Sequence, residues 1–372
     1  MKPLKPWLSF AQQLDVLQAR GLQVEDRVAA LDYLERLGYY RLSGYWYPMR
    51  SIDAEASRQQ GRAVRSDSFV PGSRFEDVVR LYVFDKKLRL LALDALERIE
   101  MAVRVDVAHL LGKRDPAAHE NPDCLHGNFS KKRITKGPNV GKTEHQLWLA
   151  KYETLLHRAR KEPFVVHHQQ QYGALPVLAA VEVWDFGLLS KLFSGMQYAD
   201  QQQIAAIYGA PDGQAFAQWL RSLNFVRNVS AHHSRLWNIN VVERAAVPTS
   251  WPAEADNARP FFYFCLMRQL LEVICPRSTW DQRVQALLHD EFPHANARLS
   301  LQDLGACEGW ALVRAGPTPC PGSRRHKVPP QMRTDAYTKC RGAGHIAGNH
   351  TRVAKALEAR RAACNPHALK KT

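Results

Sequence analysis

The sequence predicts an all-α protein. Apolar residues recur at helical spacing over long stretches, and no alternating pattern of useful length indicates a strand. The clearest case is a helix expected from about 74 to 111, where Phe75, Val78 and Tyr82 begin an apolar stripe that continues to Val103. The 372 residues, 45% of them hydrophobic, are enough for a sizeable core and about two domains.

Capping residues and glycines predict where the helices begin and end. Ser9 is the expected N-cap of the first helix, with Gln12 completing a capping box and Gly21 ending it. A second helix is expected from about 25 to 37, before Gly38. Further helices are predicted at 144–160, 176–195, 198–208, 212–236, 258–275 and 278–291, and polar loops at 51–73 and 113–143.

Composition divides the chain into three parts: an N-terminal helical and aromatic segment (1–73), a helical domain (74–310) and a basic tail (311–372). The tail is rich in proline and poor in large apolar residues, which predicts disorder. It holds 13 Lys/Arg against two acidic residues, so it contributes +11 of the net charge of +15. The body carries only +4, and the basic composition of the chain therefore says little about the body.

Location and cofactors are predicted from what the sequence lacks. Its first ten residues contain no apolar run, and no window holds 18 uncharged apolar residues. The seven cysteines are scattered, which is typical of a reducing compartment. We therefore expect a cytoplasmic protein without membrane attachment. We also expect no metal site and no cofactor, because neither 167–168 nor the Cys340, His345 and His350 set offers a complete group of ligands.

The segment from 224 to 237 concentrates the residues that carry chemistry. Arg227, Asn228, His232, His233 and Arg235 lie within nine residues. On a continuous helix Asn228, His232 and Arg235 would share one face, with Arg227 about 140° from His232. Histidine transfers protons near neutral pH and arginine binds phosphate, so the set suits RNA cleavage. The alternative is that these residues only cap or support the core, since the spacing alone is common.

A single copy of this segment would supply only one proton donor or acceptor. In-line displacement at phosphorus prefers both, and two copies facing each other across a two-fold axis would provide them. The sequence therefore predicts a homodimer with a composite site.

Three further features are weaker candidates. Glu182 lies in a predicted apolar helix and needs a partner, for which Arg227, His232 or another arginine of the body would serve. Glu100 and Arg104 are predicted to form a solvent-exposed i,i+4 pair.

The segment 39–48 holds five aromatic residues. Within it Arg41, Tyr45 and Trp46 are candidates for stacking on unpaired RNA bases. The favoured alternative is that the segment packs the N-terminal helices onto the long helix.

Taken together, these segments resemble the abortive-infection bacteriophage-resistance proteins of the AbiD/AbiF type, in the HEPN superfamily. The resemblance extends over roughly residues 5–310. It includes Lys5-Pro6 with Phe10, Leu175-Pro176, and the segments 39–48, 81–89, 97–100, 182–187 and 227–238. It implies a HEPN-like helical bundle with an N-terminal helical extension. The tail after Trp310 departs from the family's usual ending.

The resemblance also implies roles for particular residues. Arg227 and His232 match the family's R-x4–6-H ribonuclease motif, and Asn228 matches the polar residue that follows the arginine. His233 also satisfies the spacing and is the alternative to His232. HEPN ribonucleases typically act as dimers and cut RNA without metal, often as toxins in phage defence. The alternatives are a non-catalytic RNA-binding regulatory protein of the same fold and a structural dimer that binds proteins. An antitoxin or a small RNA is a candidate partner.

Overall fold

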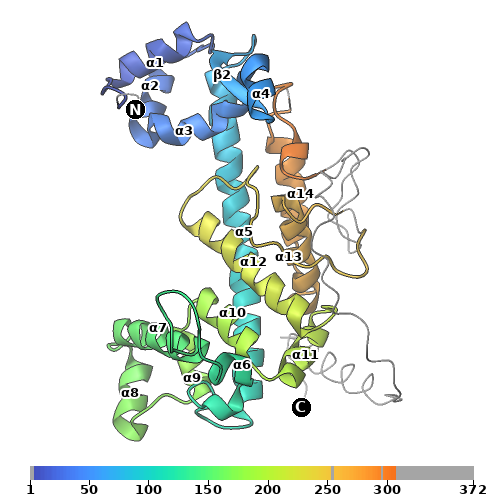
Figure 1. Cartoon of the computed structure of the whole chain (residues 1–372). Coiled ribbons are helices and arrows are strands. Elements are labelled where there is room, and N and C mark those ends of the chain that lie inside the picture. Colours follow the sequence, from blue (N-terminus) through green and yellow to red (C-terminus); the bar gives the residue numbers. More distant parts are fainter. Residues whose placement is uncertain (1–3, 253–254, 295, 307–372) are drawn as a thin grey trace, which may run out of the picture.

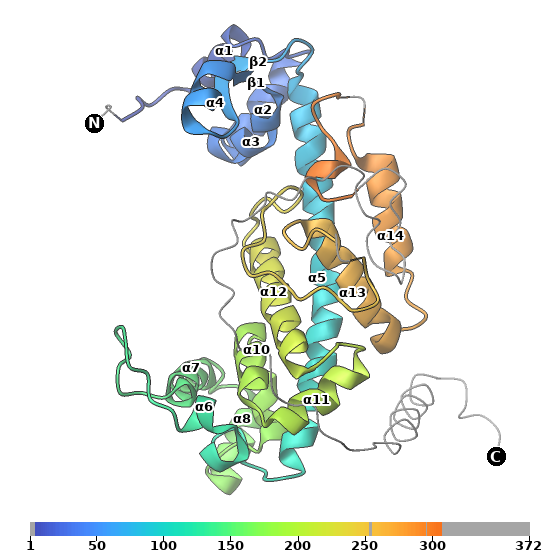
Figure 2. The ribbon, with the colours of Figure 1, turned by 45° about the vertical axis from the view of Figure 1, so that its right-hand side comes forward.

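The computed structural model describes residues 4–252, 255–294 and 296–306. Its axis is helix α5 (Phe75–Gly112), whose 38 residues extend about 57 Å. An N-terminal unit lies at one end of α5, short helices lie at the other end, and α12 and α13 pack along the middle (Figures 1 and 2). The predicted all-α class is confirmed, and the described part of the chain adds only one small sheet.

Four helices and the sheet form the N-terminal unit. The helices are α1 (Phe10–Ala19), α2 (Arg27–Leu37), α3 (Tyr39–Trp46) and α4 (Ala54–Gln60). The predicted capping box is present, because Ser9 accepts from the Gln12 amide while the Gln12 side chain accepts from the Ser9 amide. Gly21 and Gly38 adopt positive φ angles after their helices, as expected for glycine at these positions.

The predicted loop at 51–73 is wrong. The short 3-10 helix η1 (Tyr47–Met49) leads into β1 (Arg50–Asp53), which pairs antiparallel with β2 (Val64–Phe69). In the sequence, α4 connects the two strands. Both strands are short and mostly half-exposed, so they lack the alternation of apolar and polar residues that would have identified them.

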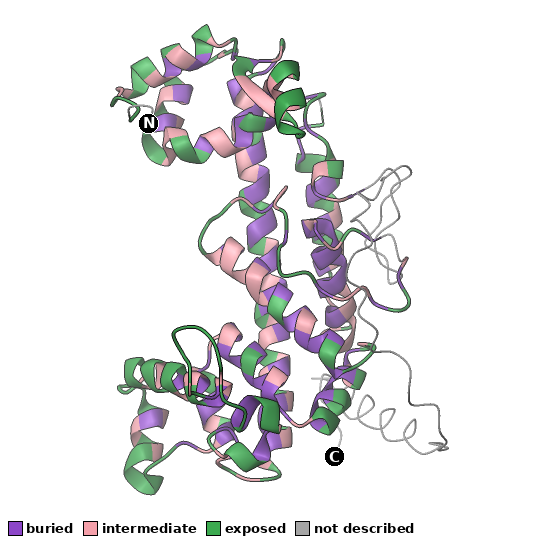
Figure 3. Ribbon diagram, viewed as in Figure 1, coloured by how far each residue is buried: buried purple, intermediate pink, exposed green. Residues whose placement is uncertain are grey.

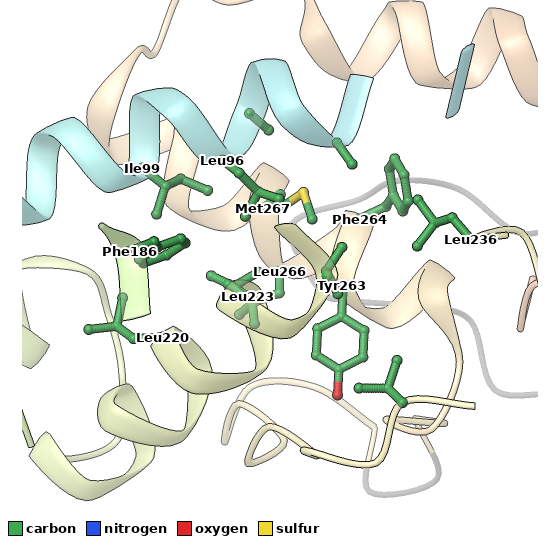
Figure 4. Close-up of a cluster of buried hydrophobic side chains, with 14 of the residues drawn as sticks. Leu96, Ile99, Phe186, Leu220, Leu223, Leu236, Tyr263, Phe264, Leu266 and Met267 are labelled. Atoms are coloured by element: carbon green, nitrogen blue, oxygen red, sulfur yellow. The ribbon is translucent and has the colours of Figure 1, made fainter. Parts of the chain in front are cut away.

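The shared core lies where α5, α10 (Phe186–Gly195), α12 (Gly213–Ala231) and α13 (Pro260–Ile274) meet. Leu96 and Ile99 of α5 face Phe186, Leu223 and Met267 (Figure 4). Buried residues follow α5 and α13 along most of their lengths (Figure 3). This packing fixes the orientation of α12, which carries the Arg227–His232 segment.

Helix boundaries elsewhere agree with the sequence in part. The elements are η2 (Pro122–Cys124), α6 (Gly127–Ser130), α7 (Glu144–Arg158), α8 (Pro163–Tyr172), α9 (Val177–Ala180), η3 (Val181–Val183), α11 (Tyr198–Ile207), α14 (Trp280–Ala286), η4 (Leu287–Glu291) and η5 (Leu301–Asp303). The helix predicted at 176–195 is interrupted, because Asp185 caps a new helix there through the Leu188 amide. Helix α8 was not predicted, and the loop predicted at 113–143 contains η2 and α6.

The segment from 113 to 172, here called the basic lobe, follows α5. Its interior is aromatic: His119 and His145 pack around Trp148, which stacks on Tyr152. The basic lobe is joined to α10 where the His126 amide donates to the Gly195 carbonyl at 3.0 Å. The lobe is therefore a packed part of the fold.

Replacing Gly195 by alanine is expected to destabilise the basic lobe. An added Cβ would lie 2.3 Å from the Phe129 ring, and such overpacking costs about 1–3 kcal/mol. The urea unfolding midpoint measures this loss. Gly127→Ala is the matched control, since nothing lies within 4 Å of its added Cβ. Equal midpoints for the two variants would contradict the expected clash.

The predicted tail at 311–372 lies outside the described residues. Among the helices that are described, none is long and apolar enough to cross a membrane.

Candidate active site

Helix α12 ends earlier than the sequence predicts. Asp212 caps its beginning by accepting from the Ala215 amide at 2.7 Å, and the helix ends at Ala231 instead of continuing to 236. His233 then adopts φ 58°, while its amide donates to Ser230 and the Ser234 amide donates to Val229. These two bonds form a Schellman motif, in which glycine usually occupies the left-handed position.

This early end changes the predicted geometry. Asn228 and His232 remain one turn apart, and the His232 amide donates to the Asn228 carbonyl at 3.0 Å. Arg235 lies beyond the turn, so it does not share a helix face with them. The prediction of a three-residue face is therefore wrong. The side chains of His232 and His233 are exposed, and Arg227 and Asn228 are half-buried.

Asp85 of α5 anchors the chain directly after the turn. This fully buried carboxylate accepts from the amides of Leu236 and Trp237, at 3.0 and 2.7 Å, and from the Tyr45 hydroxyl at 2.7 Å. Arg89, also buried, pairs with it. Burial raises the pKa of Asp85, while Arg89 and the hydrogen bonds oppose that rise. The carboxylate thus fixes the segment 234–237 to the N-terminal third of α5.

Helix α3 holds the same turn from the other side. The guanidinium of Arg41 donates to the His233 carbonyl, and that of Arg235 donates to the Gly44 carbonyl. Tyr45 and Trp46 are buried, and Tyr45 packs edge-on against Tyr82 of α5. Neither ring is accessible to an RNA base, so their predicted stacking role is wrong and packing explains them. Arg41 is exposed but its guanidinium already has a backbone partner.

A charged cluster lies farther along α5 and reaches Arg227. Arg104 pairs with Glu100 at 2.6 Å and also donates to the Trp184 carbonyl, and Lys151 of α7 pairs with Asp185 at 2.8 Å. Burial raises the pKa of Glu100, and the nearby positive charges of Arg104 and Arg227 oppose that rise. We call these five residues the Arg227 cluster.

Arg227 is the member of this cluster whose charge is available. Within the described ranges no carboxylate forms an ion pair with its guanidinium, whose recorded hydrogen bond is a long one of 3.4 Å to the Asn228 side chain. With Arg104 and Lys151 already paired, the five charged groups sum to +1. A half-buried guanidinium in this setting is suited to bind an anion such as phosphate.

The sequence identified the wrong acidic residue for this cluster. Glu182 is exposed on η3 and forms no ion pair with Arg227. The carboxylate whose charge interacts with Arg227 is Glu100, and Asp185 lies near Glu100. The Glu100–Arg104 pair was predicted to be solvated, yet each side chain is only 13% exposed. The capping position of Asp185, just before an apolar run, was the one available signal.

In the described part of the chain, no three His, Cys, Asp or Glu side chains gather in a way that could hold a metal ion. His167 and His168 contact each other and Tyr172 on α8, in the basic lobe. The tail residues Cys340, His345 and His350 lie outside the described residues.

The structure therefore defines a helical protein in which one helix end presents an exposed histidine, five residues after an arginine that has no ion pair among the described residues. A family model described as Abi-like protein matches residues 32–238, which is more than half of the chain. The chain belongs to the Abi-like protein family, and this membership supports a role in abortive-infection defence against bacteriophages. The match includes Asp85, the Arg227 cluster and the turn after α12. No curated protein and no solved structure matches the chain.

Proposed function

We propose that this protein is an endoribonuclease effector of abortive infection, with Arg227 and His232 as its catalytic residues. The observation that carries the proposal is the end of α12: Arg227 offers a guanidinium without an ion pair among the described residues, and His232 offers an exposed imidazole five residues later. The HEPN-like R-x4–6-H pattern suggested by the sequence supports the same pair.

The proposed reaction follows from these two groups. His232 removes the proton from a ribose 2′-hydroxyl, whose oxygen then bonds to the adjacent phosphorus. The bond from phosphorus to the 5′-oxygen breaks, and a second imidazole returns a proton to that oxygen. Arg227 binds the phosphate and stabilises its developing negative charge. The products are a 2′,3′-cyclic phosphate and a 5′-hydroxyl.

The second imidazole is the reason to propose a homodimer. One copy presents His232 at a single helix end, whereas the reaction uses an acid and a base together. A second copy of α12 across a two-fold axis supplies the missing group. A stable monomer with full activity would contradict this arrangement.

Sequencing of RNA ends in cells that express the protein tests the proposed reaction. Wild type is expected to create new 5′-hydroxyl ends together with growth arrest, and His232→Ala is expected to create neither. Identical ends and equal growth arrest in both strains would remove His232 catalysis from the account.

The second candidate function is RNA binding without cleavage, as proposed for a regulatory protein of the same fold. It is supported by the Arg227 guanidinium, which needs no histidine to bind phosphate. Under this function Arg227→Ala weakens RNA binding, while His232→Ala changes neither binding nor RNA integrity. Purified His232→Ala protein that binds RNA but no longer cleaves it would reject this candidate.

A further inference from the structure

The charge of the body is concentrated in the basic lobe. Residues 113–172 contain 11 Lys/Arg and six Asp/Glu, a net charge of +5. The body up to residue 310 has 38 and 34 of these residues, so the body outside the lobe carries a net charge of −1. The near-neutral charge of the body is therefore an average over two parts of the chain whose net charges have opposite signs.

Within the basic lobe, the segment from 131 to 143 is the most basic. It contains Lys131, Lys132, Arg133, Lys136 and Lys142 and no acidic residue. We call this segment the basic loop. It is exposed along nearly all of its length. An exposed row of cations of this kind fits a polyanion better than it fits a protein core.

The basic loop has a defined conformation. Arg133 and Thr143 form an antiparallel bridge, and the Ile134 amide donates to the Lys142 carbonyl at 2.8 Å. The Gly141 amide donates to the Ile134 carbonyl at 2.9 Å, and the Arg133 guanidinium donates to the Gly141 carbonyl at 2.7 Å. Its cations are thus held together before any partner binds, which reduces the entropy that binding would cost.

Three of these cations have neither an acidic partner nor a side-chain hydrogen bond within the loop among the described residues. Lys131 pairs with Asp123, and Arg133 is used within the loop. No carboxylate of the described chain pairs with Lys132, Lys136 or Lys142, and all three side chains are exposed. They are therefore available to replace the counterions of a phosphate backbone.

Helix α7 connects the basic loop to the candidate active site. It begins at Glu144, directly after the loop, and Lys151 pairs with Asp185 in the Arg227 cluster. Lys151 is seven positions after Glu144 on this helix, a rise of about 10 Å. A strand of RNA that meets Arg227 would reach the basic loop within a few nucleotides.

We propose that the basic loop binds the phosphate backbone of the substrate RNA beside the cleaved bond, without reading its sequence. This inference rests on the proposed ribonuclease function, and it assigns the substrate contact to Lys132, Lys136 and Lys142. Its expected signature is a salt-dependent affinity, because each phosphate contact releases counterions.

The test compares two triple variants of the full chain, both in the His232→Ala background so that RNA stays intact. One changes Lys132, Lys136 and Lys142 to glutamine. The control changes Arg58, Arg62 and Arg80 to glutamine, which removes the same charge. These three arginines are exposed and lie in the N-terminal unit and the first turns of α5. Binding of a short oligouridylate is measured between about 50 and 200 mM salt.

The basic-loop variant is expected to lower the slope of log affinity against log salt by about 2, because each lost contact to a single strand contributes about 0.7. The control variant should keep the slope of its parent. Equal slopes for parent and basic-loop variant would overturn the inference, and so would an equal loss in the control. Cleavage by wild type is scored separately, so a protein that binds through the loop but does not cleave would reject only the proposed function.

Discussion

His232→Ala is expected to reduce RNA cleavage by the purified protein at least about 100-fold, because general acid–base groups typically contribute about 10²–10⁴-fold. The imidazole is exposed at the end of α12, so its removal should leave the fold unchanged. Single-turnover rates measure the loss, and the urea unfolding midpoint shows that stability is retained. An unchanged cleavage rate would contradict the role of His232.

The turn itself supplies the matched control, His233→Gly. His233 occupies a left-handed position with φ 58°, which glycine adopts without strain. The variant removes the imidazole while it preserves the Schellman motif and the carbonyl that accepts from Arg41. Cleavage within a few-fold of wild type is expected. If this variant loses cleavage and His232→Ala does not, the two histidines exchange roles.

Asp85→Ala is expected to destabilise the protein by about 3–5 kcal/mol, since it leaves the buried Arg89 without its counterion. The amides of Leu236 and Trp237 and the Tyr45 hydroxyl lose their acceptor in the same step. The free energy of unfolding in urea measures the effect.

Asp94→Ala provides the comparison, because the change is the same and the residue lies on the same helix. Asp94 is 37% exposed and pairs with Arg98 and Arg283 at the surface, where such pairs contribute about 1 kcal/mol or less. Similar losses for both variants would mean that the buried network around Asp85 adds little.

The sequence predicted elements well where local chemistry decides the structure. Ser9 and Gln12 identified the start of α1, and Gly38 identified the end of α2, because capping and positive φ angles depend on neighbouring residues alone. Helix α12 was predicted too long because His233, and not glycine, adopts the left-handed turn. The helix predicted at 176–195 failed for a similar reason, since Asp185 was not recognised as a cap.

The candidate site was predictable only in its α12 residues. Asp85 and Leu236 are 151 positions apart in sequence, and an Asp within an amphipathic helix gives no sign that it will be buried. Tyr45 and Trp46 are buried, but an aromatic segment that contains an arginine is expected both for core packing and for base stacking. Composition therefore could not distinguish these two roles. Glu100 was likewise indistinguishable from a solvated partner of Arg104 until α10 and α12 were placed beside it.

Helix α5 sets the register of the candidate site from two points. Asp85 holds the turn after His232, and Glu100 lies beside Arg227, so both proposed catalytic residues depend on the stretch of α5 between two positions that are 15 residues apart. Inserting a single residue between them would rotate one anchor by about 100° relative to the other. The length of α5 between Asp85 and Glu100 thus sets the spacing between the turn after His232 and the carboxylate beside Arg227.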